Sequence, residues 1–153
     1  MTLVLRWHTF GELSGDELYE ILALRQRVFV VEQRCAYLDA DGRDRSSLHL
    51  CGRTRAGGLA AYLRLLPPGR NFAGPSIGRV ITAPEFRGKG TGRALMAEGI
   101  RRAAELYPGF PLTVAAQVHL EGFYRSLGFI PSGPPFDDDG IPHVTMVRSS
   151  AVR

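Results

Sequence analysis

The sequence lacks several features that mark particular classes of protein. It has no run of 18 apolar residues, so we expect no transmembrane helix. It has two cysteines, Cys35 and Cys51, and no cysteine and histidine spacing typical of a metal site. Disulfides persist mainly outside the cytosol, and the sequence shows no secretion signal. We therefore expect reduced thiols and a cytoplasmic protein, and from the missing ligand spacing we expect no bound metal.

The N-terminal segment and the charge pattern argue against further classes. Residues 1–10 contain Arg6 and His8 and no small-residue cleavage site, which is not typical of a signal peptide. The formal net charge of +4 suits an anionic ligand, but no run of five or more like charges occurs. Basic and aromatic residues do not alternate along a strand, so we expect no nucleic acid as partner. Without a transmembrane helix we expect no membrane partner either.

Length and periodicity predict one domain over residues 1–153, in which 44% of residues are apolar. Alternating and β-branched runs predict strands at 3–7, 46–55, 59–66, 77–82, 112–117, 129–130 and 143–148. A capping box of Ser14 and Glu17 begins a helix that we expect to end near Val28. Further helices are predicted at 92–107 and 119–127, with a second short helix within 29–45 and a turn at 137–140.

A glycine-rich segment, Arg87-Gly88-Lys89-Gly90-Thr91-Gly92-Arg93, precedes the helix predicted at 92–107. Glycines let the backbone take positive φ and approach a ligand, and a helix N-terminus attracts anions. A Walker A loop requires Ser or Thr after Lys89, and a dinucleotide loop requires glycine where Arg93 stands. The segment therefore predicts a diphosphate site of a different type.

The spacing of Arg87, Gly90 and Gly92 resembles the acyl-CoA pyrophosphate loop of the GNAT superfamily of acetyltransferases. The segment 123–129, aromatic-Tyr-x-x-Leu-Gly-Phe, resembles a second signature of that superfamily. Segments 24–33, 39–44 and 139–143 are similar to its ElaA-type branch. The resemblance implies an α/β (α+β) fold: a mixed, mostly antiparallel sheet of six to seven strands, about four helices, and a splayed βαβ site for acetyl-CoA.

The resemblance also implies roles for particular residues. Tyr124 would lie close to the coenzyme sulfur and act in catalysis, and Gln117 stands where many relatives place a CoA-contacting Asn. The backbone of the strand predicted at 77–82 would contact the pantetheine arm, and one of its N–H groups would polarise the thioester carbonyl. The implied cofactor-binding residues are Val80, Ile81, Thr82, Arg87, Gly88, Lys89, Gly90, Thr91, Gly92, Arg93, Gln117 and Tyr124.

Acyl transfer to an amine also requires a base, because an alkyl ammonium with a pKa near 10.4 must lose a proton. Glu32 is the first candidate, since it follows an apolar run and burial would raise its pKa. His49, His119 and His143 are the alternatives, as is a water relay. The acidic segments 39–44 and 137–139 lack EF-hand spacing and are expected to be solvated turns, or else to attract a cationic acceptor.

The sequence thus predicts an enzyme that moves an acetyl group from acetyl-CoA to a small-molecule amine or a peptide. A non-catalytic acyl-CoA sensor or scaffold with the same fold is the alternative. The resemblance also leaves a homodimer as an alternative to a monomer, because many relatives dimerise.

Overall fold

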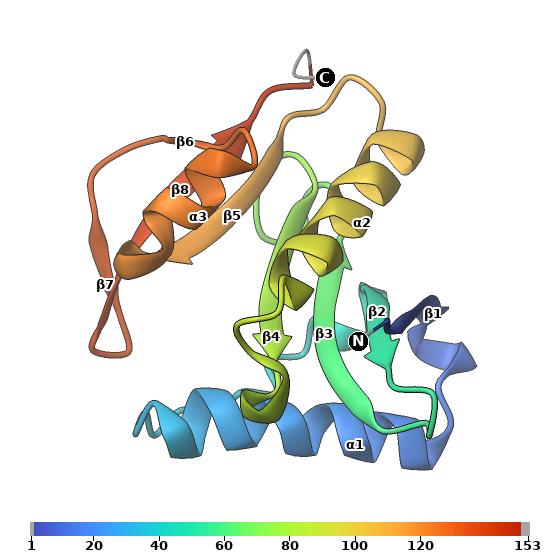
Figure 1. Ribbon diagram of the computed structural model, residues 1–153. Helices are drawn as coiled ribbons and strands as arrows, with labels where there is room; N and C mark the ends of the chain where they lie inside the picture. The colour runs from blue at the N-terminus through green and yellow to red at the C-terminus, as the bar shows by residue number, and fades with distance from the viewer. Residues whose placement is uncertain (1, 151–153) are drawn as a thin grey trace.

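A computed structural model describes residues 2–150 and arranges them around one mixed sheet (Figure 1). Within those residues the sheet has eight strands: β1 (Val4–Thr9), β2 (Leu48–Arg53), β3 (Leu59–Leu66), β4 (Ser76–Thr82), β5 (Leu112–Gln117), β6 (Ile130–Pro131), β7 (Phe136–Asp138) and β8 (Ile141–Arg148). The α-helices there are α1 (Gly15–Arg25), α2 (Thr91–Leu106) and α3 (Glu121–Ser126). Shorter helical segments are η1 (Phe10–Glu12), η2 (Gln26–Glu32), η3 (Asp44–Ser46), η4 (Pro84–Phe86) and η5 (Val118–Leu120).

The sheet is antiparallel except at one junction. Its order is β1-β2-β3-β4-β5-β8-β6, and β7 pairs with β8. The parallel pair, β4 and β5, is joined by the crossover helix α2 and is in register only at Ser76–Thr113 and Ile77–Val114. Beyond these two pairs the strands diverge (Figure 1). A ligand site is expected where neighbouring strands of a sheet separate in this way.

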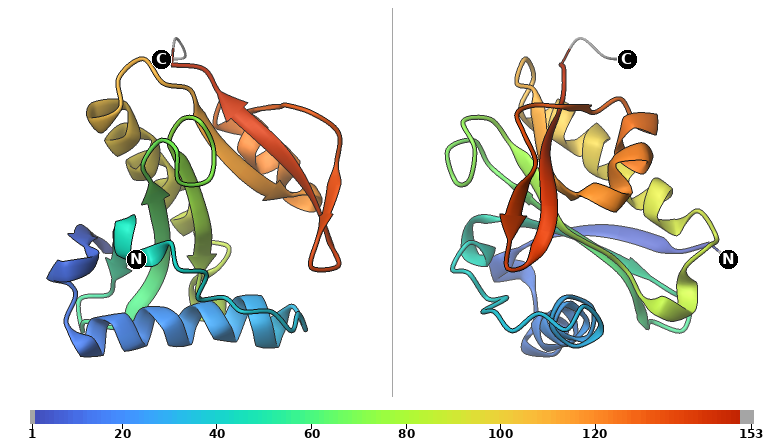
Figure 2. Two further views of the ribbon diagram at one scale, coloured as in Figure 1. Left: turned by 180° about the vertical axis from the view of Figure 1, so that it is seen from behind. Right: turned by 90° about the vertical axis from the view of Figure 1, so that its left-hand side faces the viewer.

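Helices cover both faces of the sheet (Figure 2). On one face, α2 and α3 cover a core that includes Leu63, Leu65 and Met96. On the other face, α1 packs Ile21 against Tyr62 and Ile81. Alternate side chains of a strand point to opposite faces, so β3 serves both cores and is buried almost throughout.

Most elements form where the sequence predicts them. β3 and β5 have the predicted bounds, and α2 differs by one residue at each end. The mixed, mostly antiparallel sheet is confirmed, with β7 as an additional strand where a turn was predicted. The turn itself lies at 139–140, and only residues 137 and 138 of the predicted turn belong to β7, because that strand depends on backbone pairing with β8.

The first helix is longer than predicted. α1 continues directly into η2, a π-helical segment with backbone bonds such as Gln33 N–H to Val28 O at 3.1 Å. The second short helix expected within 29–45 is therefore absent as a separate α-helix in the described chain, where only the short η3 follows. π-helical turns are rare and occur often at functional sites.

The segment 39–44 is not the solvated turn that we expected. Asp39 and Asp44 are buried, at 5% and 8% exposure, and pair with Arg25, which is fully buried. Asp41 and Asp44 also pair with Arg64 of β3. A buried carboxylate requires such partners because an unpaired charge in the interior is strongly unfavourable. These ion pairs fix the segment between η2 and β2 against the sheet.

Candidate active site

A bulge in β4 opens the sheet beside β5. The β3–β4 register pairs Tyr62 with Ile81 and Arg64 with Gly78, so two residues of β4 face Leu63 alone. One of the two, Arg79, has φ 51°, a left-handed conformation that is uncommon for a residue with a side chain. Asp39 holds it there, accepting a bond from Arg79 Nε at 2.8 Å. Bulges of this kind occur often beside active sites, where they redirect the chain.

A cavity of about 580 Å³ lies at the divergence of β4 and β5. Its walls come from β4 and β5, from η2 and the segment after it, and from the β7–β8 hairpin. Among the predicted site residues, Val80, Gln117 and Tyr124 line it. The structure thus brings Val80 of β4 to the same cavity as Gln117 of β5 and Tyr124 of α3, which follow it by 37 and 44 positions in the sequence. Its volume is typical of small-molecule sites.

Tyr124 is a buried residue of α3 that lines this cavity. It is 6% exposed, and its ring packs edge-on against Phe129 with 5.8 Å between centroids. Burial raises the pKa of Tyr124 to about 12. Its hydroxyl has no hydrogen-bond partner among the residues that the structure describes. A neutral phenol is therefore held at the cavity wall with its donor available.

The glycine-rich segment lies at the N-terminal end of α2. Gly88 and Gly90 both have φ 77°, the left-handed conformation that favours glycine. Gly90 caps α2 but has no side chain to bond the first-turn N–H groups, whereas Ser14 caps α1 with its hydroxyl. Unbonded N–H groups and the positive end of the helix dipole make this end of α2 suitable for a phosphate group. None of residues 87–93 lines the cavity.

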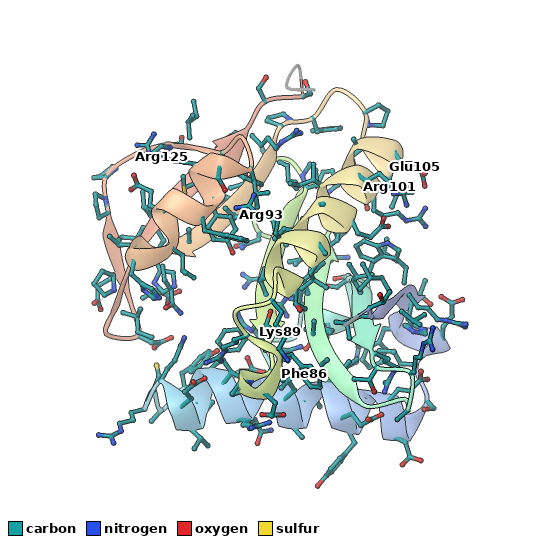
Figure 3. All side chains as sticks on the ribbon, in the orientation of Figure 1. Phe86, Lys89, Arg93, Arg101, Glu105 and Arg125 are labelled. Carbon is teal, nitrogen blue, oxygen red and sulfur yellow. The ribbon has the colours of Figure 1, made fainter. Side chains whose placement is uncertain are left out.

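The three cations of that segment have different surroundings, and two of them, Lys89 and Arg93, are labelled in Figure 3. Lys89 is exposed and forms no ion pair within the described chain. Arg93 reaches α3, where it donates to Ser126 Oγ at 2.8 Å and lies 5.5 Å from the centroid of the Phe123 ring. Arg87 is bound to protein groups instead: it donates to the Thr82 carbonyl at 3.0 Å and pairs with Glu32.

The strand residues predicted to contact the cofactor divide between the two sides of the sheet. Val80 faces the cavity, while Ile81 is 2% exposed and belongs to the core beneath α1. The Thr82 side chain lies near Gly92, where a Cβ would be 3.6 Å from Thr82 Oγ1. Gln117 ends β5 at the cavity, opposite His143 in β8.

Our reason for ranking Glu32 first as the base was wrong. The Glu32 carboxylate is exposed and accepts two bonds of 2.7 Å from the Arg87 guanidinium. This hydrogen-bonded ion pair lowers the pKa of Glu32, where burial would have raised it. Glu32 does not line the cavity either. The apolar run before it belongs to η2, and Glu32 is the last residue of that segment.

The three histidines differ in position. His49 is fully buried between the Tyr62 hydroxyl and the Asp44 carbonyl, 2.9 Å from Nε2, and it does not line the cavity. His119 is exposed in η5 and lies outside the cavity. His143 lines the cavity, and its Nδ1 is 2.7 Å from the Ile141 carbonyl. A carbonyl only accepts, so in neutral His143 Nδ1 carries the hydrogen and Nε2 is left as an acceptor.

Sequence reasoning missed the arginine–aspartate cluster and much of the cavity wall. The sequence did contain a signal. Arg64 interrupts the apolar strand at 59–66, and Arg25 lies on the same face of α1 as Ile21 and Leu22. A charged residue on an apolar face indicates a buried ion pair. Over residues 2–150, no group of histidine, cysteine, aspartate and glutamate is arranged to hold a metal ion, and no helix is long and apolar enough to span a membrane. Both cysteines are free thiols.

A mixed sheet that diverges between β4 and β5, with α2 as the crossover helix, is the fold that the sequence resemblance implied, and comparison with known proteins agrees. The profile of the acetyltransferase (GNAT) domain matches residues 40–150. The chain therefore belongs to the GNAT family of acetyltransferases, whose members use acyl-CoA.

Within that family the chain is similar to ElaA and UPF0039 proteins. A UPF0039 protein of Synechocystis sp. is 48% identical over 141 residues, covering 92% of each chain. Protein ElaA of Escherichia coli is 41% identical over 140 residues, covering 90% of this chain and 91% of its own. An acyl-CoA N-acyltransferase structure from Pseudomonas aeruginosa has a TM-score of 0.91 and 39% identity, covering 97% of this chain and all of that one.

Proposed function

We propose that this protein transfers an acetyl group from acetyl-CoA directly to a primary amine within a ternary complex. The observation that carries the proposal is the buried Tyr124, whose hydroxyl has no partner among the described residues, at a cavity between the diverging strands β4 and β5. A protein that only bound acyl-CoA would not require a buried phenol there. The acceptor is a small-molecule amine or a peptide amine.

The donor would bind across the N-terminus of α2. The diphosphate would accept from the first-turn N–H groups and from the backbone of residues 88–92, with Lys89 and Arg93 supplying positive charge. Arg87 would position the loop through Glu32 and the Thr82 carbonyl. The pantetheine arm would follow the backbone of β4 at Val80, Ile81 and Thr82 to the end of β5 at Gln117.

The reaction forms a C–N bond and breaks the C–S bond of the thioester. A neutral amine attacks the carbonyl carbon, and a backbone N–H of β4 stabilises the developing oxyanion. The proton that the amine loses is accepted by Nε2 of His143, a residue that lines the cavity and whose Nδ1 is bound to the Ile141 carbonyl.

Tyr124 assists the departing sulfur as a hydrogen-bond donor. Its pKa of about 12 is well above that of an ordinary thiol, near 8.5, so the phenol keeps its proton while the thiolate forms. The thiolate is then protonated from the imidazolium or from water. Catalysis by Tyr124 is thus electrostatic, and its burial strengthens the hydrogen bond.

The proposal is tested by acetyl-CoA consumption across classes of amines, with mass spectrometry of the products. We expect Tyr124→Phe to lower kcat by about 100-fold, the usual loss for one donor to a developing anion. Its affinity for acetyl-CoA, measured by calorimetry, should change less than about threefold, because Phe keeps the packing against Phe129.

Two results would contradict the assignment. Full turnover by Tyr124→Phe would remove Tyr124 from the mechanism. If a single-turnover experiment with the wild-type protein and every amine class left bound acetyl-CoA intact, the protein would be a sensor or scaffold instead.

A further inference from the structure

The arginines that line the cavity are paired with carboxylates, whereas two of the aspartates that line it are not paired with a cation among the described residues. Three arginines contribute to its lining, and each has a carboxylate partner. Arg43 is 3.6 Å from Asp41, Arg64 pairs with Asp41 and Asp44, and Arg79 donates to Asp39. Asp39 and Asp44 also pair with Arg25, so this wall has one more arginine than aspartate, but each of its arginines is already engaged by a protein carboxylate.

The facing wall carries negative charge without a partner. Asp138 and Asp139, in the β7–β8 hairpin, line the cavity and form no ion pair within the described part of the chain. The hairpin is held across the cavity by Cys35, whose thiol donates to the Asp139 carbonyl at 3.2 Å. His143 lies on the same hairpin, opposite Phe136 in the β7–β8 register. The unpaired carboxylates and the imidazole that would accept the amine proton thus share one element.

The rim of the cavity is apolar and exposed. Leu38, Phe136 and Leu120 line the cavity, yet they are 86%, 40% and 39% exposed. They come from three separate segments: the chain after η2, β7 and η5. Exposed apolar side chains gathered around a cavity mark a binding surface rather than chance exposure. Polar groups inside and apolar groups at the rim suit an amphipathic ligand.

We infer that the acceptor is a small primary monoamine on an apolar body, with no carboxylate beside the amine. The inference rests on the proposed function. Asp138 and Asp139 attract the ammonium group, and the apolar body covers Leu38, Leu120 and Phe136. A carboxylate beside the amine is repelled by the same two aspartates, since the cavity arginines are already paired. Tyr124, which is 6% exposed and whose hydroxyl has no hydrogen-bond partner among the described residues, marks the end at which the amine reacts.

Three probes separate the chemical features of the acceptor. Phenethylamine has an apolar body and one ammonium group, phenylalanine adds a carboxylate to the same body, and cadaverine replaces the body with a second ammonium group. We expect kcat/KM for phenethylamine to exceed both others by about tenfold or more, the effect of one favourable contact of about 1.4 kcal/mol. A preference for phenylalanine or cadaverine overturns the inference and leaves the proposed acetyl transfer intact.

Variants test the two aspartates and the apolar rim separately. The double variant Asp138→Asn/Asp139→Asn is expected to raise KM for phenethylamine about tenfold at low salt while kcat stays within about twofold. Asp137→Asn is the matched control, because Asp137 does not line the cavity and asparagine keeps the oxygen that accepts from Gly140 N–H. An unchanged KM in the double variant, or an equal rise in the control, overturns the role of the carboxylates.

Leu38→Ser tests the rim in the same way. We expect KM for phenethylamine to rise about threefold to tenfold and KM for cadaverine to stay constant, since only the first probe covers the rim. Val31→Ser is the control, because Val31 is 70% exposed and does not line the cavity. A shared increase for both probes would contradict an apolar subsite.

Calorimetry keeps this inference distinct from the proposed function. Phenethylamine is titrated into the full chain with CoA present, and the double aspartate variant is titrated in parallel. Binding that depends on Asp138 and Asp139 without any turnover supports the subsite and contradicts acetyl transfer. Turnover of phenethylamine with equal binding to wild type and variant contradicts the subsite alone.

Discussion

At the scale of single residues, the chemistry of each candidate group depends on one or two neighbours. The Ile141 carbonyl sets the tautomer of neutral His143, which lines the cavity, and leaves Nε2 as an acceptor. Arg87 holds Glu32 as a carboxylate outside the cavity, and burial keeps Tyr124 protonated. The sequence identifies Glu32, His143 and Tyr124 as candidates, but it does not contain the contacts that decide among them.

His143→Asn is the sharpest test at this scale. Asparagine keeps a donor near the Ile141 carbonyl and removes the free ring nitrogen, so we expect kcat/KM at pH 7 to fall by about 100-fold or more. The loss should shrink as pH rises, because an alkyl amine with a pKa near 10.4 is increasingly neutral without a base. The measurement is a pH–rate profile with the best amine of the panel.

The control for that profile is His119→Asn. His119 is exposed and does not line the cavity, so its variant should keep the wild-type profile. A wild-type rate in His143→Asn at pH 7 would exclude His143 and favour a water relay.

At the scale of elements, three irregularities prepare the site: the bulge in β4, the π-helical η2, and the absence of a side-chain cap on α2. The bulge separates β4 from β5, and η2 brings Phe29 to the cavity wall. Two exposed ion pairs, Arg27–Glu85 and Arg87–Glu32, join η2 to the loop before α2. Periodicity predicts α2 well, whereas a π-helix or a bulge depends on packing that periodicity does not describe.

Glu32→Gln distinguishes this linking role from catalysis. Glutamine can still accept from Arg87, and exposed ion pairs contribute only about 0.2–1 kcal/mol. We therefore expect an unchanged kcat–pH profile and a rise in KM for acetyl-CoA of less than about fivefold. Glu85→Gln, which weakens the neighbouring ion pair with Arg27, should behave alike. A large loss of kcat that recovers at high pH would instead identify Glu32 as the base.

At the scale of the whole molecule, buried ion pairs connect elements that are distant in sequence. Arg25 of α1, Arg64 of β3 and Arg79 of β4 meet Asp39, Asp41 and Asp44 beside the cavity. Burial by itself would raise the pKa of Asp44, but its hydrogen bond to Arg25 and the nearby Arg64 lower that pKa overall. The pKa of Asp41 is lowered in the same way, chiefly by Arg64 against the effect of burial.

These shifts predict acid sensitivity. Carboxyl groups with a lowered pKa in the folded state stabilise it above their unfolded pKa, about 3.9, and this stability is lost as pH falls further. Asp44→Asn should lower the free energy of unfolding at pH 7 by about 3–5 kcal/mol, because Arg25 loses a buried partner. Urea unfolding at pH 7 and at lower pH measures both effects, and the variant should show the shallower pH dependence.

The control for stability is Glu121→Gln. It weakens the exposed i,i+4 pair with Arg125, for which we expect about 0.5 kcal/mol or less. Equal losses in Asp44→Asn and Glu121→Gln would show that the buried cluster is not a special source of stability.

The sequence by itself determined the local features of this protein. The glycine loop, the start of α2 and the buried strands β3 and β5 follow from residues adjacent in the chain, because backbone conformation and periodicity are local properties. The resemblance to the GNAT family rests on the same local segments, and the family profile confirms it. The family, and with it the use of acyl-CoA, could therefore be predicted before the structure.

Only the tertiary structure decided which charged groups surround the cavity. Arg79 meets Asp39 from 40 positions away, and Cys35 meets Asp139 from 104 positions away. The ionisation of an acid depends on burial and on the charges within a few ångströms, which are fixed by the fold. That is why Asp39 and Asp44 are buried and paired with Arg25, and why Glu32 is paired outside the cavity. It is also why Asp138 and Asp139 line the cavity without an ion pair among the described residues.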